Sequence, residues 1–372
     1  MRQSQIHPLA HHSPHVFRCE LLHLTHLTDA NRYQELLAAA AFVSDTIVAQ
    51  LTELMKCLHP AVKDAGQLQA LATAHLNGTA PEQYGVWAYY PWSHRLVHLL
   101  DEAEYSLVRT NRNRFKITDA EQAQLSTKKI GIIGLSVGQS VALALALERG
   151  FGELRLADFD TLDLSNLNRL RAGVHELGLN KAVVAARQIA ELDPFLKVTC
   201  FTEGLTEANM DDFFSGGGLL DLLIEECDNL EIKIKSRLKA RSLNIPVLMD
   251  TSDRGMLDVE RFDREPERDI LHGLLGELQD AKQLAALSPA ERMQLVLQIA
   301  GGTQISDRGK ASLAEIGKSI STWPQLGSAV MLGGGAAADV ARRLLLDEGI
   351  RSGRYYVDLA DIIPGQKKHE VL

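Results

Sequence analysis

The chain has 372 residues, of which 45% are hydrophobic and 23% are charged, and its formal net charge is −9. This length suits two or three domains, and the composition excludes disordered and fibrous proteins. The longest apolar runs cover seven or eight residues, so no membrane partner is expected, and the acidic balance argues against nucleic acid as a partner. The polar N-terminus and four widely spaced cysteines favour a cytoplasmic location and exclude a structural zinc site of the usual spacing.

Residues 1–108 are predicted to form a helical domain. One helix is expected from Thr28 or Asp29 to just before Pro60, a second around residues 67–76 and a third over residues 94–108. We interpret the aromatic residues between 84 and 92 as a packed loop, with base stacking or peptide clamping as alternatives. Six histidines near the N-terminus favour a solvated tail over a metal-binding tract: His7, His11, His12, His15, His23 and His26.

Residues 109–372 are predicted to form an α/β domain with a Rossmann-like, doubly wound and mostly parallel sheet. From Lys129 to Asp250, short apolar runs alternate with helical segments, which is typical of a parallel sheet covered by helices on both faces. A less buried strand is expected at residues 256–263, which completes a nucleotide-binding core at 128–263. Residues 264–372 are expected to be rich in helix and to end in a strand, and the small residues at 333–338 to serve close helix packing.

The first strand–helix turn of this domain reads GIIGLSVGQS. Such a turn brings backbone amides and a helix N-terminus to a phosphate, although Ser136 stands where the G-x-G-x-x-G pattern has a glycine. The same letters spell the G-x-S-x-G elbow of hydrolases, but a turn after the first strand is an unusual place for that motif. Asp158 follows Gly134 by 24 residues and suits the ribose hydroxyls of an adenine nucleotide, either NAD or ATP.

The residues that follow this strand resemble one family. The order is D-x-D at Asp158 and Asp160, then S-N-x-N-R ending at Arg169, then N-K ending at Lys181, then D-N at Asp228. This order resembles the ThiF/MoeB family of ATP-dependent activating enzymes, relatives of the ubiquitin-activating enzyme. The turn GLSVGQS and the stretch TSDRGMLDVERFD look most like the ThiF-type module of ThiF–nitroreductase fusion proteins.

The resemblance implies a site for ATP and Mg²⁺. Asp158 would hold the ribose, Asn166 and Arg169 the ribose or phosphates, and Lys181 would neutralise the phosphates. Asp228 would hold the magnesium ion. Arg112, in the segment R-T-N-R-N, would reach the ATP of the other subunit of a homodimer. The remaining predicted nucleotide contacts are Gly134, Ser136, Gly138, Asp160 and Asn229.

The implied reaction is adenylation of a carboxylate, at the C-terminal glycine of a ubiquitin-like or sulfur-carrier protein or of a peptide. A terminal carboxylate is already ionised at pH 7, so the reaction needs cations and alignment rather than a general base. No cysteine follows Cys227, so no thioester step is expected, and Cys200 and Cys227 are interpreted as packing. The alternatives are an NAD-dependent oxidoreductase and an inactive, nucleotide-binding regulatory subunit, which the altered glycine turn makes plausible.

Overall fold

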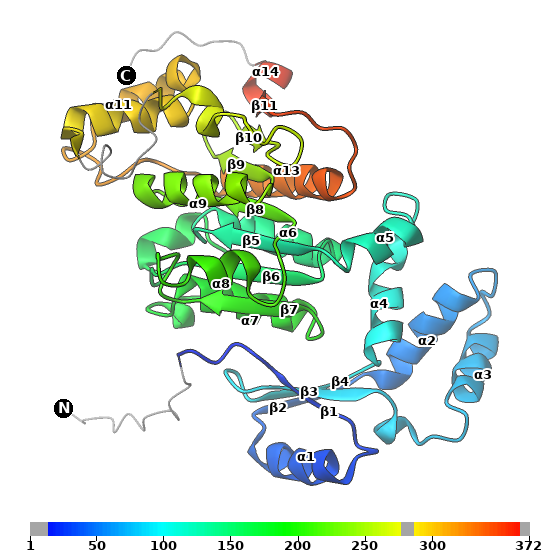
Figure 1. Cartoon of the computed structure of the whole chain (residues 1–372). Coiled ribbons are helices and arrows are strands. Elements are labelled where there is room, and N and C mark those ends of the chain that lie inside the picture. The colour runs from blue at the N-terminus through cyan, green and yellow to red at the C-terminus, as the bar shows by residue number, and fades with distance from the viewer. Residues whose placement is uncertain (1–13, 277–285, 365–372) are drawn as a thin grey trace, which may run out of the picture. The chain divides into compact units, whose positions relative to one another are not determined.

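A computed structural model describes residues 14–276 and 286–364 and divides the chain into two compact units (Figure 1). The first unit contains the described residues up to Gln122 together with Ala186–Leu196, and the second contains the rest. The boundary after Ala185 falls inside helix α7 (Lys181–Leu192), which therefore contributes to both units.

Among its described residues, the first unit has a four-stranded sheet and four α-helices that lie wholly within it. The strand order is β1 (Glu20–Leu22), β3 (Val86–Tyr90), β4 (Arg95–Leu99) and β2 (Phe42–Asp45), and only the β2–β4 pair is parallel. The helices are α1 (Leu27–Ala39), α2 (Ile47–Leu58), α3 (Ala65–His75) and α4 (Glu102–Thr110). Helix α5 (Asp119–Leu125) begins in the first unit and ends in the second, because the boundary falls after Gln122.

The prediction of a helical N-terminal domain is wrong in part, because the first unit also contains a four-stranded sheet. The long helix expected up to Pro60 is interrupted by β2, the aromatic loop is the buried strand β3, and the helix expected at 94–108 begins as β4. Pairing between distant segments decides these elements, because Phe42 pairs with Arg95 across the sheet and every residue of β3 is buried. Tertiary pairing of this kind overrides local helix propensity.

The second unit is built on a seven-stranded sheet and confirms the predicted α/β fold. The strand order is β11 (Gly353–Tyr356), β10 (Met256–Glu260), β9 (Val247–Thr251), β8 (Leu222–Glu225), β5 (Lys129–Ile133), β6 (Glu153–Ala157) and β7 (Lys197–Phe201). Five adjacent strands are parallel to one another: β9, β8, β5, β6 and β7. Strands β10 and β11 are antiparallel to their neighbours. Every residue of β10 is buried, so the expectation of a less buried strand there is wrong.

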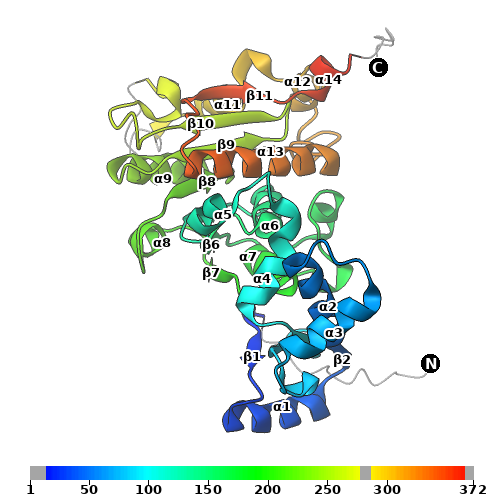
Figure 2. The same ribbon diagram turned by 90° about the vertical axis from the view of Figure 1, so that its right-hand side faces the viewer.

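Helices lie on both faces of this sheet (Figure 2). The described helices of the second unit are α6 (Gly138–Glu148), α7, α8 (Met210–Ser215), α9 (Leu230–Ser242), α11 (Pro289–Ile299), α12 (Asp307–Leu313), α13 (Gly327–Leu345) and α14 (Leu359–Ile362). Successive residues of a strand face opposite sides: Gly131 faces Phe213 of α8, whereas Ile132 faces Gly138 of α6. In the described ranges no helix has the length and apolarity that a membrane crossing requires.

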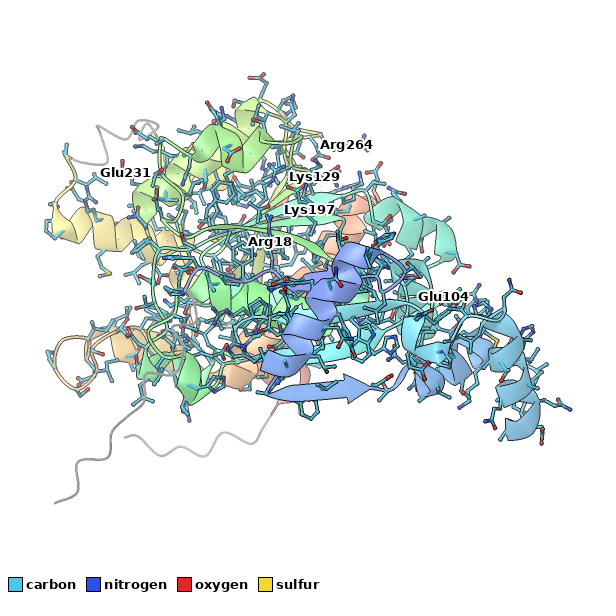
Figure 3. All side chains as sticks on the ribbon, turned by 90° about the horizontal axis from the view of Figure 1, so that it is seen from below. Arg18, Glu104, Lys129, Lys197, Glu231 and Arg264 are labelled. Atoms are coloured by element: carbon cyan, nitrogen blue, oxygen red, sulfur yellow. The ribbon has the colours of Figure 1, made fainter. Side chains whose placement is uncertain are left out.

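The amino ends of the parallel strands carry a separate set of charges. Glu153, on β6, accepts a hydrogen bond from Lys197 of β7 at 2.8 Å and lies 3.5 Å from Lys129 of β5, two lysines that are labelled in Figure 3. The guanidinium of Arg155 also donates to Glu153, at 2.9 Å. These three cations therefore form ion pairs with the buried carboxylate of Glu153, at the end of the sheet opposite to the carboxyl ends of the parallel strands.

Candidate nucleotide site

A cavity of about 580 Å³, counting its open mouth, lies at the carboxyl ends of β5, β6 and β8. The sheet order places β6 on one side of β5 and β8 on the other, so the chain leaves β5 at a point where the topology reverses direction. Open α/β sheets bind ligands in the crevice that such a reversal creates. Six of the predicted site residues line this cavity: Gly134, Ser136, Asp158, Asp160, Asp228 and Asn229.

Gly134 is required by the turn that follows β5. Its φ is +85°, and a Cβ atom there would lie 2.7 Å from the backbone nitrogen of Cys227 and from the carbonyl of Glu226. Gly138 is the first residue of α6, and a Cβ on it would lie 2.7 Å from Ile132. The two glycines therefore let the turn lie against the end of β8 and let α6 begin close to the sheet.

Asp158 links the turn after β5 to the turn after β6, and both turns border the cavity. Its carboxylate accepts hydrogen bonds from the backbone nitrogens of Leu135 at 2.6 Å and Asp160 at 2.8 Å. Burial raises the pKa of Asp158, and the two backbone donors oppose that effect. The carboxylate is thus held in place at the end of β6. The sequence predicted that this residue binds the ribose of the nucleotide.

Two cationic side chains are fixed beside the cavity by its lining residues. Arg169 donates to the hydroxyl of Ser136 from Nε at 3.2 Å and from Nη2 at 3.0 Å, and Lys181 donates to Asp160 at 2.8 Å. Burial lowers the pKa of Arg169, while the charge of Asp228 favours its ionised form. Lys181 is buried and Asp228 is exposed. The arrangement offers two cations and the exposed carboxylates of Asp160 and Asp228 around a glycine turn.

Two of the predicted residues, Asn166 and Asn229, have structural roles, and a third, Arg112, lies in the first unit. Asn166 is buried, and its side chain accepts from the backbone of Asp163 at 3.0 Å, which shapes the loop after β6. The side chain of Asn229 accepts from Ile232 and so caps α9. Arg112 lies in a short 3₁₀ turn of the first unit, and its reach toward a second subunit stays a prediction.

Sequence reasoning missed two polar or aromatic residues of the cavity, Phe159 and Glu226. Phe159 is 67% exposed, so its ring is available to stack on a base. Both residues had a signal, because an aromatic between two aspartates and a second glutamate at the end of a buried strand are unusual. Cys227 packs against the hydrophobic core, as predicted, and also lines the cavity, and burial raises its pKa well above the ordinary thiol value.

A magnesium ion would depend on phosphate oxygens at this site. Among residues 14–276 and 286–364, no group of three or more histidine, cysteine, aspartate or glutamate side chains is arranged to hold a metal ion. Mg²⁺ is commonly held by one or two carboxylates together with substrate phosphates and water. The exposed carboxylate of Asp228 fits that manner of binding.

The sequence model of the ThiF family matches residues 110–325, which is more than half of the chain. The chain therefore belongs to the ThiF family, and the resemblance seen in its motifs is confirmed. The match covers the strands and turns that surround the cavity.

Among curated proteins, the "Uncharacterized protein MT1398" of Mycobacterium tuberculosis (strain CDC 1551 / Oshkosh) is 46% identical over 274 residues, which cover 74% of this chain and 38% of that protein. The ubiquitin-like modifier-activating enzyme 5 of Bombyx mori is 26% identical over 144 residues, which cover 37% and 36%. The chain thus spans well under half of the length of either relative. Among solved structures, the E. coli tRNA N6-threonylcarbamoyladenosine dehydratase TcdA in complex with AMP is 18% identical, with a TM-score of 0.47 and coverage of 68% of this chain and 99% of that one.

Proposed function

We propose that this protein binds ATP with Mg²⁺ in the cavity and adenylates a carboxylate. The observation that supports it best is the convergence of the Gly134 turn, Arg169, Lys181 and Asp228 at one edge of the sheet. A hydride-transfer enzyme for NAD needs the turn and Asp158 but gives no role to these cations and to the exposed Asp228. Membership of the ThiF family agrees with the adenylating alternative.

Each side chain has a definite task in this proposal. Asp158 and Asp160 border the ribose, Phe159 stacks on the base, and Arg169 and Lys181 move from their present partners to the phosphate oxygens. Lys181 is now bonded to Asp160, which keeps the ammonium extended and ordered before ligand arrives. Mg²⁺ held by Asp228 supplies further neutralisation of the phosphate charge. These groups stabilise charge that develops on the α-phosphate, which is where preorganised cations have most effect.

The attacking group is the terminal carboxylate of a ubiquitin-like protein, a sulfur-carrier protein or a peptide. Such a carboxylate is ionised at neutral pH, so its attack requires alignment and not proton removal. A thioester step is absent from the proposal, since burial keeps Cys227 protonated and a protonated thiol is a poor nucleophile.

We also propose a two-fold dimer in which Arg112 completes the site of the other protomer. The test mixes Arg112→Ala protein with Lys181→Ala protein, each of low activity alone. If Arg112 acts in the site of the other protomer, each mixed dimer regains up to one working site. If Arg112 acts within its own chain, no activity is regained. A monomer in light scattering at micromolar concentration would also remove this part of the proposal.

The adenylation itself is tested by exchange of labelled pyrophosphate into ATP in the presence of candidate acceptors with free carboxyl termini. Exchange that requires Mg²⁺ and stops when the acceptor's terminal carboxylate is amidated supports the proposal. Exchange with tRNA in place of a protein or peptide would change the acceptor class. Binding of NAD without any binding of ATP would refute it.

A further inference from the structure

The guanidinium group of Arg169 is held at both ends. Nε and Nη2, which share one edge, donate to the hydroxyl of Ser136, a residue that lines the cavity. Nη1, at the far end, donates to Oδ1 of Asn168 at 2.9 Å. An edge with two parallel N–H donors matches the oxygens of a phosphate group, and such a contact leaves the far nitrogen unused. The edge that a phosphate would use is therefore the one bonded to the cavity lining.

Asn168 is itself fixed by a second partner. Its Nδ2 donates to the backbone carbonyl of Gln325 at 2.8 Å, two residues before α13 begins at Gly327. A carbonyl only accepts and a guanidinium only donates, so the two partners together allow one orientation of the Asn168 amide. A Cβ atom on Gly327 would lie 2.8 Å from the carbonyl oxygen of Asn168, so this glycine lets the loop lie against the start of α13. Asn168 therefore ties the far end of Arg169 to the segment that enters α13.

The backbone next to Arg169 is anchored separately. Leu170 is buried, and the buried side chain of Gln139 in α6 accepts from the backbone nitrogen of Arg171 at 2.9 Å and donates to its carbonyl at 3.1 Å. These contacts fix where the side chain of Arg169 starts, but an arginine stem has many rotamers and its end can point in several directions. In the described part of the chain, the guanidinium has hydrogen bonds to two side chains alone, those of Ser136 and Asn168. These two side chains therefore decide its direction.

We propose that Asn168 is a positioning residue: it holds Arg169 by Nη1 while a phosphate oxygen of the nucleotide replaces the hydroxyl of Ser136 at Nε and Nη2. This inference rests on the proposed function, because the phosphate is that of the bound ATP. The exchange leaves the hydrogen bond to Asn168 in place, so the guanidinium is oriented before the phosphate reaches it. A side chain whose freedom is already restricted loses less entropy on binding, and this favours the complex.

The proposal also gives a role to the serine that interrupts the glycine pattern of the turn. The oxygen of Ser136 accepts two hydrogen bonds from Arg169, so its own hydroxyl proton is directed away from the guanidinium. Among residues 14–276 and 286–364, no group accepts that proton in a hydrogen bond. When a phosphate oxygen takes over the two bonds from Arg169, the hydroxyl can donate to the same phosphate group. The altered turn thus offers a side-chain donor where the usual pattern has a glycine.

A double-mutant cycle on ATP binding tests the inference. The dissociation constant of ATP with Mg²⁺ is measured by calorimetry, or by ligand-observed NMR where binding is weak, for the wild type, Asn168→Ala, Arg169→Ala and the double variant. Asn168→Ala should weaken binding about tenfold, as for the loss of one hydrogen bond to a charged group, and Arg169→Ala should weaken it more. In the Arg169→Ala background, Asn168→Ala should have no further effect, because Asn168 acts through the guanidinium. A merely structural role would weaken binding in both backgrounds.

Ser165→Ala is the matched control, because Ser165 is exposed in the same short 3₁₀ helix (Leu164–Asn168), and it should leave the affinity unchanged. If melting curves show that Asn168→Ala has not folded, Gly327→Ala takes its place in the cycle, since the new Cβ would displace Asn168. Equal losses with and without Arg169 would overturn the inference, and so would an unchanged affinity of Asn168→Ala. A wild-type protein that binds no ATP would refute the proposed function as well, whereas wild-type binding that Asn168→Ala leaves intact overturns the inference alone.

Discussion

Replacing Gly134 by alanine tests how closely the glycine turn lies against the end of β8. A residue other than glycine with φ near +85° loses about 1–2 kcal/mol from backbone strain. The new Cβ would also lie 2.7 Å from backbone atoms of Glu226 and Cys227, which cannot rotate away as a flexible side chain can. Overpacking of this kind costs about 1–3 kcal/mol. We therefore expect Gly134→Ala to lower the free energy of unfolding by about 2–5 kcal/mol.

Gly178→Ala is the matched control, because its φ is +86° and a Cβ there meets nothing within 4 Å. It should show the backbone cost alone, about 1–2 kcal/mol. Urea unfolding followed by circular dichroism measures both variants, and a shift in midpoint without a change in slope reports stability. Equal losses in the two variants would refute the claim that the turn is held against β8.

Three further predictions concern the cavity. Lys181→Ala should lower pyrophosphate exchange by about 10²–10³-fold, as for removal of one preorganised electrostatic group, and unchanged exchange would place that role elsewhere. Glu226→Gln should raise the melting temperature at pH 8 more than at pH 5. The pKa of Glu226 is raised in the folded protein, so wild-type stability falls as the pH rises past 4.5, the pKa of an unperturbed glutamate. An effect of the substitution that does not depend on pH would contradict this. A non-reducing gel of protein incubated with ATP and acceptor should show no reductant-sensitive conjugate, and one that disappears in Cys227→Ser would establish a thioester.

The sheet of the second unit was predictable because its strands are short apolar runs that alternate with helices. Ile130, Ile132 and Ile133 mark β5 without any knowledge of its neighbours. In the first unit, β2 is defined by its pairing with β4 rather than by its own residues, since Phe42 and Val43 are exposed. A local pattern contains no such information, and the alanines before Phe42 favour a helix.

The sequence predicted that the cations and acids of the candidate site lie together, and the structure places them at or beside the cavity, but their present partners were not predictable. Arg169, Lys181 and Asp228 follow a motif order in the sequence, whereas the bonds from Arg169 to Ser136 and from Lys181 to Asp160 depend on the fold. The surroundings of Asp250 were not predictable, because only the packed sheet and α13 bring it together with Glu226 and Gly333.

The central claim is that the cavity takes ATP with Mg²⁺, and a thermal-shift titration tests it most directly. ATP with Mg²⁺ at 100 times its dissociation constant should stabilise the protein by about 2.7 kcal/mol. Lys181→Ala should weaken that effect, and NAD should give none. A shift with NAD and none with ATP and Mg²⁺ would contradict the account.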